Sequence, residues 1–260
     1  MNTAVALTNI VLGIAYCGYG LMTMVEMNRD WDVLGFSHFG AAWIFMAFTC
    51  GPHHLFHGSH VALEGRVGGW LDLVAVVVGL PAGVIWLALR VEAFVGGRGD
   101  RFIPGSPRWV KILPVIGVVY TVALATAGVY VVVSHGGIAD TESVTFANAA
   151  LVGLYLAIAY FVGRTQIRNH GTSQGWSVSG LSLTIVFVTC ALMHGVWGVY
   201  SLTGQYGHDV HGLVIDWLSV PAACYFLWVV RGLYKDSLRD WNTRATEPAP
   251  APVLVPSRRP

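Results

Sequence analysis

The sequence TCGPHHLFHGSH places four imidazoles and one thiol at the end of a long apolar run. Cys50, His53, His54 and His57 follow one another at steps of three, one and three residues, so a helix would carry them on one face. His60 extends that face by another three residues. Imidazole and thiolate are ligands of zinc, copper and iron. The stretch therefore predicts a group of transition-metal ligands on one side of a single helix.

Composition places this helix in a lipid bilayer. Of 260 residues, 55% are hydrophobic and 11% are charged, whereas soluble domains average about 25% charged residues. A membrane-spanning helix needs about 20 mainly apolar residues. By that criterion we expect an all-α integral membrane bundle of seven transmembrane helices within residues 1–235, with spans near 4–25, 37–58, 70–90, 111–134, 146–163, 178–202 and 210–232. Residues 236–260, rich in proline and alanine, are expected to form a disordered cytoplasmic tail.

The basic residues predict the orientation of the spans. Fourteen of the 15 Lys and Arg lie in the loops at 26–36, 90–111 and 164–177 or in the C-terminal tail, and the opposite side carries Arg66. Basic loops remain in the cytoplasm, so the N-terminus of this multi-pass protein of the cell membrane is expected outside and the C-terminus inside. Eight of the ten histidines then fall in the outer half of the bundle or at its outer surface. Because no basic patch is interleaved with aromatic residues, nucleic acid is not an expected partner.

The pattern of the second span returns 140 residues later. Cys190 and His194 repeat the four-residue spacing of Cys50 and His54. The same displacement matches Gly58 with Gly198 and Pro81-Ala82 with Pro221-Ala222, and a weaker match pairs IAY at 14–16 with IAY at 158–160. These matches predict a three-plus-one-plus-three plan, in which two parallel repeats are joined by span 4 and related by an axis near the membrane normal.

The expected metal site draws on spans 2, 3, 6 and 7. Its candidate ligands are Cys50, His53, His54, His57, His60, Asp72, Cys190, His194, His208, His211 and Asp216. We expect the pairs nearest the outer surface to bind the metal, namely His57, His60, His208 and His211. His54 and His194 lie deeper, and Asp72 and Asp216 suit carboxylates that accept the second N–H of a ligating imidazole.

Three functions are compatible with such a site. In a membrane-embedded metalloenzyme, the metal would activate water or oxygen, and a lipid or another apolar substrate would enter from the outer leaflet. In a copper- or metal-handling transporter or sensor, the cluster would capture an ion without chemistry; the inner span halves carry almost no ionisable groups, which disfavours a transport pathway. In a b-type haem electron carrier, His54 and His194 would be axial ligands from facing helices. The sequence leaves the metal (zinc, copper or iron) and the oligomeric state open.

One short segment resembles a known family. In LMHGVWG, at 192–198, Met193-His194 and Gly198 resemble the Met-His motif of bacterial seven-span sensor domains thought to bind copper near the outer face. The strict Met-His-Tyr-Thr order of that motif is absent, so the resemblance implies no site residues in this chain.

Overall fold

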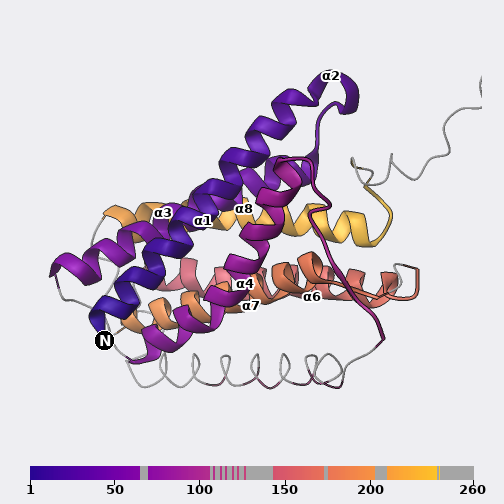
Figure 1. Cartoon of the computed structure of the whole chain (residues 1–260). Coiled ribbons are helices and arrows are strands. Elements are labelled where there is room, and N and C mark those ends of the chain that lie inside the picture. The colour runs from indigo at the N-terminus through magenta and orange to yellow at the C-terminus, as the bar shows by residue number, and fades with distance from the viewer. Residues whose placement is uncertain are drawn as a thin grey trace, which may run out of the picture.

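The computed structural model describes residues 1–64, 70–105, 143–172, 175–202, 210–238 and 240, together with a few single positions between 108 and 126. Its long helices are α1 (Asn2–Arg29), α3 (His38–Glu64), α4 (Trp70–Phe94), α6 (Ser143–Asn169), α7 (Val178–Leu202) and α8 (Val210–Tyr234) (Figure 1). The short α2 (Trp31–Leu34) follows α1. A two-residue strand, β1 (Phe102–Ile103), pairs antiparallel with β2 (Trp176–Ser177) just before α7. The predicted all-α class is confirmed.

Six predicted spans coincide with these helices to within a few residues at either end. Five helical segments in the described part of the chain are long and apolar enough to cross a membrane: α1, α4, α6, α7 and the Val214–Tyr234 portion of α8. α3 has 27 residues and is long enough to cross a membrane, but its histidines lower its mean hydropathy, and it is not among these five. The predicted span at 111–134 lies almost entirely outside the described residues, as does nearly all of the predicted tail at 236–260.

The outer faces of the helices are apolar. On α1, Leu7, Ile14 and Leu21 recur every seven residues, and 59%, 60% and 55% of their respective surfaces are exposed. Water would penalise such a stripe, whereas lipid tails would not. The exposed surface of the bundle is therefore compatible with a bilayer environment.

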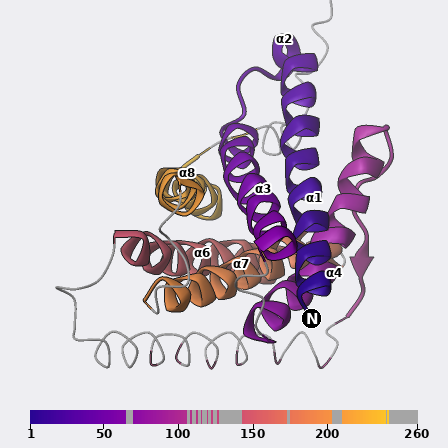
Figure 2. The same ribbon diagram turned by 90° about the vertical axis from the view of Figure 1, so that its left-hand side faces the viewer.

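The six long helices pack in a closed order. α1 packs against α3 and α4, α6 packs against α7 and α8, and the two groups meet where α3 contacts α8 and α4 contacts α7. Followed around, these contacts give the ring α1–α3–α8–α6–α7–α4. In Figure 1, α6, α7 and α8 run side by side while α1 and α4 cross them obliquely, and Figure 2 shows α8 end-on. α3 and α7 stand opposite one another in the ring, so their inward side chains meet in its interior.

Close contact between α1 and α3 depends on glycine. Gly51 and Gly58 flank His54 on α3. A Cβ atom at Gly58 would lie 2.9 Å from the carbonyl oxygen of Ala6, and one at Gly51 would lie 3.0 Å from a backbone nitrogen of α1. Small residues allow helices in lipid to approach this closely. The approach brings His54 against Asn9 of α1.

Aromatic side chains fill the ring beside the histidines. Tyr19 and Trp43 have their ring centroids 4.5 and 4.4 Å, respectively, from that of Trp86. Phe187 and Phe226 stack with their centroids 5.2 Å apart. These five residues come from α1, α3, α4, α7 and α8, and such edge and offset contacts stabilise beyond the area that they bury. The cluster holds the histidine-bearing segments of α3 and α7 in place.

Candidate metal centre

Four histidines are buried in the interior of the bundle. His53, His54 and His57 lie on α3 and His194 lies on α7, and none exposes more than 4% of its surface. Buried imidazole nitrogens need hydrogen-bond partners or ligands. The partner of each ring therefore decides which nitrogen carries the proton.

Asn9 assigns the proton position of His54. The Nδ2 amide of Asn9 donates to the carbonyl oxygen of Val5 at 2.9 Å, which turns Oδ1 of Asn9 toward His54. That oxygen lies 2.8 Å from Nδ1 of His54. Because an amide oxygen can only accept, Nδ1 of His54 carries the proton and Nε2 keeps its lone pair.

Asn148 of α6 fixes His194 in the same way. Its Nδ2 amide donates to the carbonyl oxygen of Val144 at 2.9 Å and to Oδ2 of Asp216 at 2.6 Å. Its Oδ1 lies 2.7 Å from Nδ1 of His194. By the same reasoning, Nε2 of His194 keeps a lone pair that can bind a metal.

Two buried carboxylates hold the remaining histidines. Asp72 of α4 and Asp216 of α8 are both 0% exposed. Nε2 of His57 donates to Oδ2 of Asp72 at 2.7 Å, and Nδ1 of His53 lies 3.1 Å from Oδ1 of Asp216. Carboxylates that accept from imidazole orient the ring and raise its basicity as a ligand. Asp72 and Asp216 thus stand where such partners were expected.

The two interior thiols pair crosswise with tyrosines. The hydroxyl of Tyr16, on α1, lies 3.8 Å from Sγ of Cys190 on α7. The hydroxyl of Tyr155, on α6, lies 3.3 Å from Sγ of Cys50 on α3. Both thiols line the same interior cavities, and neither forms a disulfide. Two free thiols from α3 and α7 therefore face a common space inside the bundle.

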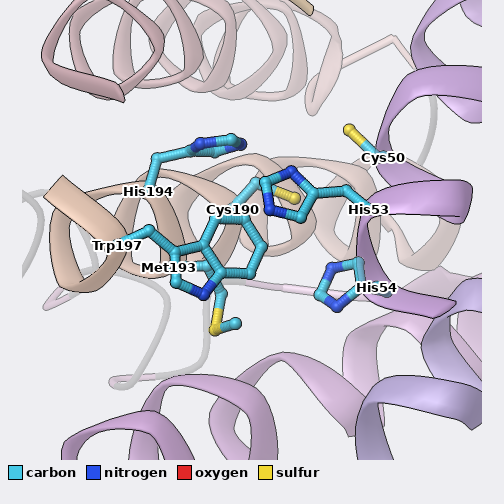
Figure 3. A pocket seen from close by; sticks show the side chains of 7 residues that line it. All are labelled: Cys50, His53, His54, Cys190, Met193, His194 and Trp197. Carbon is cyan, nitrogen blue, oxygen red and sulfur yellow. The ribbon is translucent and has the colours of Figure 1, made fainter. Parts of the chain in front are cut away.

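Trp197 of α7 lies among the imidazoles. Its indole stacks on His53 with the ring centroids 3.7 Å apart and the planes 15° apart. Its centroid lies 4.9 Å from that of His194 and 6.0 Å from that of His54. The stacked pair of Trp197 and His53 separates His54 from His194 (Figure 3).

A small cavity opens between these side chains (Figure 3). It is lined by Cys50, His53, His54, Cys190, Met193, His194 and Trp197. Its volume is about 10 Å³, room for about one water molecule or one ion. A second cavity of the same size, bordered by the same two cysteines, has apolar walls that include Trp43 and Phe187. Within the described residues, no three His, Cys, Asp or Glu side chains stand together as a ready metal-binding set.

Eight of the predicted ligands are gathered in or beside this interior: Cys50, His53, His54, His57, Asp72, Cys190, His194 and Asp216. His60 lies apart from them. Its side chain is 33% exposed, and its Nε2 is 4.0 Å from Oε1 of Glu64. His208 and the side chain of His211 fall outside the described residues. The centre of the cluster therefore lies deeper than the outermost pairs that the sequence favoured.

The sequence patterns did not reveal the asparagines and tyrosines that contact the histidines and cysteines of the site. Asn9 and Asn148 are separated by 139 residues, as are Tyr16 and Tyr155. The sequence comparison used a displacement of 140 residues, and a displacement of 139 would have matched both pairs. The IAY match instead aligned Tyr16 with Tyr160. That alignment is wrong for the side chains, since Tyr16 is buried and Tyr160 is 59% exposed.

No protein-family model, curated protein or solved structure matches the chain.

Proposed function

We propose that this chain is a multi-pass protein of the cell membrane that binds a soft transition metal inside its helix bundle. The N-terminus faces outward, because basic segments mark the cytoplasmic side and the loops at 26–36, 90–111 and 164–177 together with the C-terminal tail carry 14 of the 15 Lys and Arg. The site then lies in the outer half of the bundle. We further propose that the protein handles or senses the metal rather than acting on a lipid.

The observation that carries this proposal is the pair of asparagine-fixed imidazoles. His54 and His194 each donate through Nδ1 to an asparagine whose own amide is anchored to a backbone carbonyl. Nε2 of each ring is thereby left as an electron-pair donor in a nearly dry interior. Holding the far nitrogen in this way is the usual support of a metal-binding histidine.

Charge in the interior favours a cation. Asp72 and Asp216 are 0% exposed, and each lies within ion-pair distance of a buried histidine. Intramembrane ionisable groups generally mark functional sites. Carboxylates placed behind the imidazoles favour a cation over an anion in this interior.

The donor atoms favour copper(I) among the metals. Two thiols, three imidazoles and the thioether of Met193 line the first cavity, and soft sulfur ligands select copper(I) or zinc. Zinc prefers four protein ligands in a tetrahedron. The described residues contain no three-membered set of His, Cys, Asp or Glu at metal-binding positions, which suits a low-coordinate soft ion better than zinc.

The size of the cavity weighs against the other two functions. Ligand pockets for organic molecules hold about 300–1,000 Å³, far more than the roughly 10 Å³ found here. A haem between His54 and His194 would also have to displace the stack of Trp197 on His53. A lipid substrate meets the same obstacle.

Copper(I) affinity of asparagine variants tests the proposal. The full chain in detergent is loaded anaerobically with copper(I), and its dissociation constant is measured against a competing chelator. We expect Asn9→Leu and Asn148→Leu each to weaken binding by about 10–100-fold, the usual effect of losing the partner of a ligating imidazole. Asn169→Leu, at the end of α6 and away from the site, is the matched control and should bind as the wild type does. A wild-type chain that retains no copper(I), zinc or iron would refute the proposed function.

A further inference from the structure

The site residues divide into two clusters of the same composition. The first cluster contains Asn9, Tyr16, His54 and Cys190. Its imidazole bonds to the asparagine, its thiol contacts the tyrosine hydroxyl, and the centroids of the imidazole and phenol rings are 5.4 Å apart. The first cluster therefore offers one imidazole Nε2 and one thiol as metal ligands.

The second cluster contains Asn148, Tyr155, His194 and Cys50. Here the asparagine lies 2.7 Å from the imidazole, the tyrosine hydroxyl lies 3.3 Å from the thiol, and the two ring centroids are 5.2 Å apart. Every contact of the first cluster thus has a counterpart in the second.

The order of the helices relates the two clusters. Exchanging α1 with α6, α3 with α7 and α4 with α8 converts the ring α1–α3–α8–α6–α7–α4 into itself, turned by half. The exchanged residues are 139 or 140 positions apart in the chain: Asn9 with Asn148, Tyr16 with Tyr155, Cys50 with Cys190 and His54 with His194. The exchange of helices that preserves the contact order therefore also exchanges the two clusters, including their thiols.

We infer that the chain holds two metal ions, one in each cluster, and this inference rests on the proposed function. Nε2 of His54 and Sγ of Cys190 bind the first ion. Nε2 of His194 and Sγ of Cys50 bind the second. Each ion is coordinated by an imidazole from one half of the chain and by a thiolate from the other half. The two ions therefore cross-link the two halves.

A single shared ion fits the geometry less well. It would have to reach both His54 and His194, which line one cavity but lie on either side of the stacked rings of Trp197 and His53. A two-donor site needs fewer ligands than the sets of three His, Cys, Asp or Glu that are absent from the described part of the chain. Copper(I) accepts such sites of few, soft donors.

The metal-to-protein ratio tests the inference. Full-length protein in detergent is loaded with copper(I) under anaerobic conditions, freed of excess ion, and analysed for copper and for protein. We expect two ions per chain in the wild type, one in His54→Leu, one in His194→Leu and none in the double variant. The control is His170→Leu, which replaces a half-buried histidine outside both clusters whose Nε2 lies 2.7 Å from the carbonyl oxygen of Gly105. This variant should keep both ions.

The outcomes separate this inference from the function on which it rests. One ion in the wild type would overturn the paired sites and leave a metal-binding protein. No copper in a wild-type chain that also retains no zinc or iron would overturn both. Two ions that are lost together in either single variant, or kept in both, would overturn the assignment of one histidine to each ion. The metal-to-protein ratio of the wild type is measured without any variant, so it tests the paired sites even if the histidine variants do not fold.

Discussion

Replacing both interior cysteines with serine is expected to weaken copper(I) binding by at least about 100-fold. Loss of a partner that merely supports a ligand costs about 10–100-fold, and the Cys50→Ser/Cys190→Ser variant removes the sulfur donors themselves. A serine hydroxyl is slightly smaller than a thiol and is a hard donor, which a soft ion does not favour. The variant should therefore keep the packing of α3 against its neighbours while losing the ion.

The chain supplies its own control for this experiment. Cys17 lies on α1 outside both clusters, and Cys224 lies exposed on α8. Cys17→Ser/Cys224→Ser removes the same number of thiols and should bind copper(I) with the affinity of the wild type. The dissociation constants of the three proteins are compared by competition with a chelator. Equal affinities in the two double variants would show that the interior thiols hold no metal.

The Asp216→Leu variant is expected to be the least stable single variant of the site. Its carboxylate is 0% exposed, accepts from Nδ2 of Asn148 at 2.6 Å and lies 3.1 Å from Nδ1 of His53. Leucine would leave both donors buried without this acceptor. Breaking a buried pair on one side costs about 3–5 kcal/mol, and we expect a loss of that size in the free energy of unfolding.

Unfolding of the metal-free protein in detergent measures this loss. The metal must be absent, so that weaker binding does not add to the effect. Asp236→Asn, in which an exposed carboxylate beyond α8 loses its charge at a position with a φ of 53° that asparagine also tolerates, should change the free energy of unfolding by no more than about 1 kcal/mol. If Asp216→Leu unfolds at the same denaturant concentration as the wild type, the carboxylate does not anchor Asn148 and His53.

The helices were the most predictable part of the molecule. Apolar runs long enough for a bilayer leave little choice of structure, because helices satisfy their own backbone hydrogen bonds in lipid. The predicted spans at 70–90 and 178–202 therefore agree closely with α4 and α7. The ends were less predictable, since polar residues can extend a helix beyond the apolar run, as in α1, which continues to Arg29.

The site was predictable in its residue types and less so in its depth. Spacing placed Cys50, His54 and His57 on one face, and they share the buried side of α3. The spacing did not reveal that His60 turns partly outward, because a helix end that leaves the bundle has the same periodicity as one that stays inside it. The exposure of each turn depends on the neighbouring helices.

The supporting residues were beyond the reach of ligand-type reasoning. Asn9 and Asn148 are neither common metal ligands nor unusual in a helix, and they become informative once the packing of α1 on α3 and of α6 on α7 brings each beside a histidine. The match between the halves of the chain identified the cysteines and histidines. It paired Tyr16 with Tyr160 through the IAY segments, however, and therefore did not identify Tyr155.

X-ray absorption at the copper edge of the copper(I)-loaded protein identifies the atoms bound to the ion. We expect a first coordination shell that contains both sulfur and imidazole nitrogen in the wild type, and no sulfur in the Cys50→Ser/Cys190→Ser variant. A first shell of nitrogen and oxygen alone, or one that is unchanged in that variant, would contradict a soft-metal site between α3 and α7.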